Sequence, residues 1–140
     1  MAMTIGVDHV EGDPPVAVVT LEGELDASNY EQLIEAVRQA YAAGARGLVL
    51  DCAGLTFMAS SGLFALHSAV RIMRGETPPD PEAGWGALHE MSGDHDTEGG
   101  NVRIAAAQDA IVRVLDRTGM SKLFGMSDTR DDAVAAIQGG

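Results

Sequence analysis

The chain is organised around LVLDCAGLTFMASSGLFALH, residues 48–67. This stretch opens with a short apolar run, Leu48 to Leu50, which is typical of a buried strand. It closes with apolar residues at the three- and four-residue spacing of a helix: Leu63, Leu66, Val70 and Met73. We predict a loop over Thr56 to Gly62 between the two elements. Such a loop lies at the carboxyl end of its strand, where open α/β sheets usually hold their sites.

Two adjacent hydroxyls, Ser60 and Ser61, stand at the expected start of this helix. Free backbone N–H groups and the positive end of the helix dipole favour an anion there. The hydroxyls therefore serve either as a helix cap or as a place for a phosphate. From the residues alone, the cap is the simpler interpretation.

Upstream, Thr4 to Val10 and Val16 to Leu21 have strand character, and the turn residues between them predict an antiparallel hairpin. Ser28 and Glu31 then have the spacing of a capping box. They introduce a predicted helix that Gly44 ends, with an apolar stripe of Tyr30, Leu33, Ile34, Val37 and Tyr41.

Downstream, the pattern predicts a strand over 101–107, a helix capped by Asp109 and ended by Gly119, a short strand over 122–125 and a helix over 129–138. A strand, helix, strand order with short loops implies parallel strands and right-handed crossovers. The predicted fold is α/β: a small mixed, mostly parallel sheet of four to five strands packed against about four helices.

The composition fits one domain over residues 1–140, with 46% hydrophobic and 21% charged residues. No apolar run reaches the ~18 residues that span a bilayer, so we expect no direct membrane insertion. The lack of a signal sequence and the single Cys52, expected to be buried, favour a cytoplasmic location. The net charge of −12 argues against nucleic acid and anionic membrane partners, and it is explained more simply by solubility than by a basic partner.

The segment from about 75 to 100 interrupts the pattern. It holds three prolines, several glycines and seven acids, but neither Lys nor Arg, so we expect a disordered insertion. Its apolar residues hint at one short amphipathic helix: Trp85, Leu88 and Met91. Its candidate metal ligands have no fixed ligand spacing, and no metal site is predicted from them: His89, Asp94, His95 and Asp96.

Catalysis is not expected. A serine between a strand and a helix is similar to the nucleophile elbow of α/β-hydrolases, but Met58 stands where that elbow needs its first glycine. There is no phosphate-binding glycine loop, zinc motif or recognisable triad order. The sequence predicts a protein that is not an enzyme and needs no cofactor.

Two motifs carry a family resemblance. Phe57 to Leu63 resembles the Asp-Ser-Ser-Gly loop of the STAS domain, the fold of bacterial anti-sigma factor antagonists, and Leu21 to Asp26 is similar to that family's Gly-Glu-Leu-Asp segment. Ala59 departs from the pattern, which has an acidic residue there. The resemblance implies phosphorylation at Ser60 and a partner-binding surface that includes Glu24, Asp26, Met58, Ala59, Ser61, Gly62 and Leu63. Asp26 is explained about equally well as a residue that only helps to begin the next helix.

The resemblance implies a cytoplasmic binding module for an anti-sigma factor that is also a serine kinase, with binding weakened by phosphate on Ser60. A second interpretation is an unphosphorylated STAS accessory subunit of a membrane transport complex, of the ABC type for lipids or anions. A third is an anion or nucleotide site at Ser60 to Gly62. The sequence leaves the oligomeric state open, a homodimer included.

Overall fold

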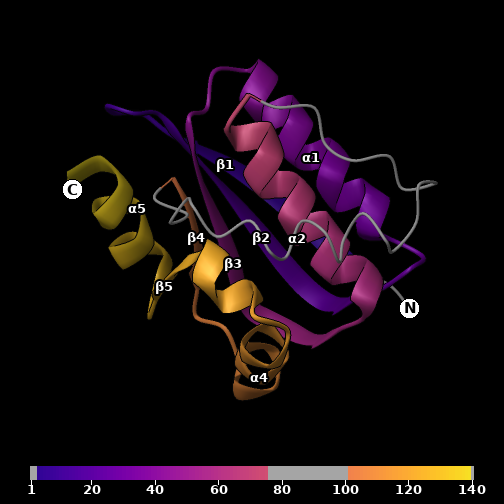
Figure 1. Ribbon diagram of the computed structural model, residues 1–140. Coiled ribbons are helices and arrows are strands. Elements are labelled where there is room, and N and C mark those ends of the chain that lie inside the picture. Colours follow the sequence, from indigo (N-terminus) through magenta and orange to yellow (C-terminus); the bar gives the residue numbers. More distant parts are fainter. Residues whose placement is uncertain (1–2, 76–100, 140) are drawn as a thin grey trace.

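A computed structural model describes residues 3–75 and 101–139 of the chain. Its five strands form one sheet in the order β1-β2-β3-β4-β5, with β1 antiparallel to β2 and the other neighbours parallel (Figure 1). The strands are β1 (Met3–Val10), β2 (Val16–Leu25), β3 (Gly47–Met58), β4 (Val102–Ala105) and β5 (Gly125–Ser127). The predicted mixed, mostly parallel sheet is confirmed. Residues 76–100, which hold most of the predicted insertion, lie outside the described residues.

Helices cover both faces of this sheet. The described helices are α1 (Tyr30–Ala42), α2 (Ser60–Met73), α4 (Asp109–Thr118) and α5 (Arg130–Gly139), with a 3₁₀ turn, η2 (Met120–Leu123). Side chains of α1, α2 and α4 belong to the large core on one face, whereas α5 packs on the opposite face. Figure 1 shows α1 and α2 side by side, with α5 well apart from them.

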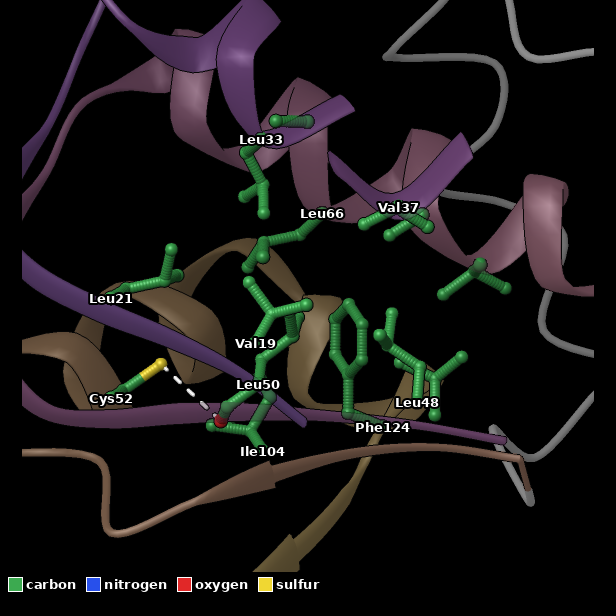
Figure 2. Close-up of a cluster of buried hydrophobic side chains, with 14 of the residues drawn as sticks. Val19, Leu21, Leu33, Val37, Leu48, Leu50, Cys52, Leu66, Ile104 and Phe124 are labelled. Carbon is green, nitrogen blue, oxygen red and sulfur yellow. Dashed lines mark hydrogen bonds between the residues drawn. The ribbon is translucent and has the colours of Figure 1, made fainter. Parts of the chain in front are cut away.

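The large core consists of inward-facing strand residues together with the side chains of α1 and α2 that pack on them (Figure 2). Its labelled members are all buried: Val19, Leu21, Leu33, Val37, Leu48, Leu50, Leu66, Ile104 and Phe124. Cys52 lies among them, as expected, and its Sγ donates to the Leu50 carbonyl at 3.7 Å. Burial raises the pKa of this thiol to about 12, so it stays protonated and unreactive at neutral pH.

The smaller core on the other face holds α5 through Ala133, and one arginine at the start of the helix adds polar contacts to the sheet. The Arg130 guanidinium reaches three strands. It lies 2.9 Å from the largely buried Asp51 carboxylate on β3, donates to Thr20 Oγ1 on β2 at 2.7 Å, and lies 3.4 Å from Asp8 on β1. The hydrogen bonds and charge of Asp51 raise the pKa of Arg130 further, which keeps this link ionised.

Two predictions near the site were wrong. Strand β3 continues to Met58, through part of the predicted loop, because parallel pairing with β2 persists across two register shifts. The capping box is absent, because α1 has Asn29 as its N-cap and the Ser28 hydroxyl donates to Asp26 Oδ1 instead, at 2.6 Å.

Two smaller predictions were also wrong. Asp109 is the first residue of α4 rather than its cap, which is Gln108. The strand expected over 122–125 is mostly the end of η2 and the turn after it, and β5 follows at Gly125.

Replacing Arg130 by methionine should lower the free energy of unfolding by about 1–3 kcal/mol, because the largely buried Asp51 loses its charged donor. Urea denaturation measures the change. Arg38→Met is the matched control, since Arg38 meets Glu35 at 3.4 Å on an exposed helix face. Exposed pairs of this kind contribute about 0.2–1 kcal/mol. Equal losses in the two variants would contradict the role given to Arg130.

Candidate functional site

The site lies where β3 turns into α2. A single residue, Ala59, connects them. Its N–H donates to the Leu25 carbonyl at the end of β2 at 2.9 Å, and its own carbonyl accepts from Gly62 N at 2.9 Å and Leu63 N at 3.3 Å. The first turn of α2 is therefore fixed to the carboxyl ends of two adjacent parallel strands by backbone hydrogen bonds, whatever side chain stands at position 59.

Gly62 lets this turn approach the sheet closely. A Cβ added at this glycine would lie 2.7 Å from Met58 Cγ and 2.9 Å from Leu25 Cγ, both closer than van der Waals contact allows. The glycine of the Ser-Ser-Gly motif is thus required by packing.

The two serines face different surroundings. Ser60 is exposed, whereas Ser61 has only 4% of its surface accessible. Met58, Gly62 and Leu63 are buried as well. Of the two hydroxyls that the sequence singled out, only that of Ser60 is presented to solvent.

Neither serine caps α2. The N-cap is Ala59, whose side chain accepts no hydrogen bond, and the serines are the first two helical residues. The cap, which was the simpler interpretation of the sequence, is therefore wrong. The first turn of α2 also has no acidic residue, so no side-chain carboxylate of that turn offsets the positive end of the helix dipole.

The Gly-Glu-Leu-Asp segment lies at the same end of the sheet. Glu24 of β2 is in register with Phe57 of β3, and Asp26 follows one residue after β2 ends. The segment is held by Asn29, which is buried: its Oδ1 accepts from Asp26 N at 2.9 Å and its Nδ2 donates to the Glu24 carbonyl at 2.8 Å. The structure therefore brings Glu24 and Asp26, both half-buried, to the same edge as Ser60.

Two residues of this edge were not singled out from the sequence. Asn29 was passed over in favour of Ser28 as the start of α1, although an asparagine before a helical stripe is an equally good signal. Phe57 is 49% exposed at the end of β3. An aromatic residue inside the predicted loop was the available signal for it, since aromatic residues are enriched at protein interfaces.

The ionisation of Asp26 is set by Ser28. The Ser28 hydroxyl donates to Oδ1 at 2.6 Å and the Ser28 amide donates to the same oxygen at 2.9 Å. Both hydrogen bonds, the hydroxyl's first, hold the pKa of Asp26 below its ordinary value. The edge next to Ser60 therefore keeps this negative charge at neutral pH.

Other kinds of site find no support in residues 3–75 and 101–139. No cluster of three or more metal-ligating side chains occurs within these ranges. The candidate ligands His89, Asp94, His95 and Asp96 lie outside them. Among the described helices, none is both long and apolar enough to cross a bilayer.

Gly62→Ala should lower the free energy of unfolding by about 1–3 kcal/mol, because the added methyl group forces Met58 and Leu25 apart. Thermal or urea denaturation measures the loss. Gly139→Ala is the matched control, since this helical glycine has nothing within 4 Å of an added Cβ. A Gly62 variant as stable as the control would contradict the close approach described above.

Ser28→Ala should raise the pKa of Asp26 toward its ordinary value, because the variant lacks the hydroxyl donor. NMR titration of the Asp26 carboxyl measures this pKa in both proteins. A depressed carboxyl pKa stabilises the fold above the unfolded-state pKa, and this stabilisation is lost as the pH falls through the folded-state value. The stability difference between wild type and variant should therefore shrink in acid. An unchanged pKa would show that the hydroxyl is not its main cause.

Comparison with known proteins identifies the family. The family model described as "Mlab, STAS domain" matches residues 9–78, which is half of the chain and includes both motifs. No curated protein matches the sequence.

Solved structures agree with this match. An anti-sigma factor antagonist from Mycobacterium paratuberculosis is 25% identical, with a TM-score of 0.67 over 97% of this chain and 94% of its own. The phosphorylated Bacillus cell fate determinant SpoIIAA is 18% identical, with a TM-score of 0.62 over 96% and 99% of the two chains. SpoIIAA in its unphosphorylated form is 17% identical, with a TM-score of 0.58 over 98% and 100%. The chain belongs to the STAS domain family, and its structural neighbours are anti-sigma factor antagonists.

Proposed function

We propose that this protein is a non-enzymatic, cytoplasmic binding module that acts as an anti-sigma factor antagonist. It binds an anti-sigma factor, itself a serine kinase, through the edge of the sheet around Ser60. The resemblance to the Mycobacterium paratuberculosis antagonist over nearly the whole chain supports this role. The SpoIIAA structures, at lower identity, support the fold.

One observation carries the proposal: Ser60 presents an exposed hydroxyl on a turn that the backbone holds in place. A kinase must reach its acceptor oxygen without unfolding the substrate. Ser61 cannot serve in the same way, because it is buried within the first turn of α2. We therefore assign the phosphate acceptor to Ser60 alone.

A phosphate at this position suits the fold. Phosphoserine adds about −1.5 to −2 charges at pH 7. At the amino end of a helix, negative charge contributes about 0.3–1 kcal/mol of stability. The first turn of α2 has neither a side-chain cap nor an acidic residue that already supplies this charge. Modification should therefore leave the domain folded.

The same phosphate would act strongly at a protein contact. Glu24, the ionised Asp26 and the exposed Phe57 lie at the same edge as Ser60. We propose that they form the contact surface together with Ala59, while the buried Met58, Ser61, Gly62 and Leu63 support it from beneath. Added negative charge would repel acidic groups of the partner and would have to be desolvated on binding. Binding is thereby switched without a change of fold.

A second candidate is the unphosphorylated accessory subunit of a membrane transport complex. Ala59 favours it, because alanine offers a kinase no carboxylate beside the acceptor. Co-purification from the host distinguishes the candidates: a sigma-regulating kinase supports the first and an ABC-type ATPase supports the second.

Ser60→Asp should weaken binding to the anti-sigma factor by about tenfold or more, equivalent to roughly 1.4 kcal/mol. Ser60→Asn is the matched control, since it has nearly the same size without the charge and should bind more tightly than the aspartate variant. Ser60→Ala should bind equally well with and without ATP, whereas the wild type should weaken when ATP is added. Isothermal titration measures the affinities, and intact mass with site localisation should find the phosphate on Ser60. Equal affinities for all forms would remove the switch.

A further inference from the structure

Strand β1 is an edge of the sheet with no neighbour on its outer side among the described residues. It is eight residues long, whereas the opposite edge, β5, has three. Edge strands are normally protected against further pairing by Lys, Pro, bulges or short length. Strand β1 contains neither Lys nor Pro, and its register with β2 runs without a shift from Met3 to Val10. This edge is therefore open to another strand.

The hydrogen bonds fix which residues of β1 point outward. The Pro15 carbonyl accepts from Arg46 N and Gly47 N, so it faces β3. Backbone groups alternate in direction along a strand, and the next residues of β2 that face β1 are Val16, Val18 and Thr20. Their register partners face back toward β2: Val10, Asp8 and Gly6. The remaining residues direct their N–H and C=O groups away from the sheet: Met3, Ile5, Val7 and His9.

We propose that β1 pairs antiparallel with β1 of a second copy of this chain, about a two-fold axis at Gly6. A symmetric pair must set outward-pointing residues opposite one another. Centring the pair on Gly6 sets Met3 opposite His9 and Ile5 opposite Val7 of the other copy, so all four outward residues are used. Centring it on Val7 would instead set Met3 opposite Glu11, beyond the end of β1.

The side chains suit this register. Val7 is 41% exposed on the sheet face that also carries Ile5, and each would cover the other across the axis. Asp8 would lie opposite Thr4, so no like charges meet, which matters in a chain with a net charge of −12. Asp8 also lies 3.4 Å from Arg130, which reduces repulsion between the two copies.

Pairing through β1 leaves the Ser60 edge free. Two sheets joined antiparallel point the carboxyl ends of their parallel strands in opposite directions, so each copy would keep its own Ser60 surface. The dimer is therefore independent of the function proposed above, and either can fail without the other.

Val7→Lys tests the interface, because an edge lysine opposes strand addition. Met126→Lys is the matched control, since Met126 is 39% exposed on β5 at the other edge. Sedimentation equilibrium of the full chain over a range of concentrations should show a wild-type dimer. The Val7 variant should have a dimer dissociation constant at least about tenfold higher, so it should dissociate at higher protein concentrations than the wild type, and the control should behave as wild type. A wild type that stays monomeric up to millimolar concentration, or equal weakening by both lysines, overturns the proposal.

Gly6→Cys tests the register without adding charge. At the axis the two Cα atoms would form a non-hydrogen-bonded pair about 4.5 Å apart, within the range that a disulfide spans. An added Cβ at Gly6 meets only Thr20 Cβ, at 4.0 Å, and the native Cys52 is buried and cannot compete. Mild oxidation should give a covalent dimer on a non-reducing gel. Thr4→Cys, which would face Asp8 of the other copy, should cross-link far more slowly. Faster cross-linking of the Thr4 variant than of the Gly6 variant overturns the proposed pairing.

Discussion

The close approach of α2 to the sheet determines the rest of the site. Gly62 lies against Met58 and Leu25, and no larger residue fits without displacing them. This contact fixes the rotation of the helix about its own axis. Successive residues of a helix point about 100° apart, because a turn has 3.6 residues. With Gly62 facing the sheet, Ser60 lies about 160° away on the far side of the helix and is exposed, whereas Ser61, about 100° away, is buried.

Backbone groups provide most of the support around Ser60. Ala59 is held through its own N–H and carbonyl, and the neighbouring β2 end is held by Asn29, which bonds to the backbone of Asp26 and Glu24. On the opposite face, Arg130 joins three strands. A site built on such a scaffold can change its surface charge while its geometry persists, as a binding switch without refolding requires.

The fold could be predicted from the sequence because its strands and helices have strong apolar periodicity, and the two motifs pointed to the STAS family. The site could be predicted only in outline. Which serine is exposed depends on the helix rotation set by Gly62, a tertiary contact between residues from β2, β3 and α2. The extension of β3 to Met58 depends on pairing with β2 across bulges, which local propensity does not encode. Asn29 and Ser28 are both good cap residues, so only the tertiary bonds of Asn29 decide between them.

The departure at Ala59 also has a physical consequence for the proposed switch. Position 59 has extended backbone angles, φ −86° and ψ 175°, which any ordinary residue adopts, so alanine does not disturb the turn. A carboxylate there would already offset the positive end of α2, and a phosphate added next to it would meet like charge. With alanine, a phosphate on Ser60 would be the first negative group in that turn. Under the proposed function, alanine would therefore remove a recognition group for a kinase, but it would leave the amino end of α2 better suited to hold a phosphate on Ser60.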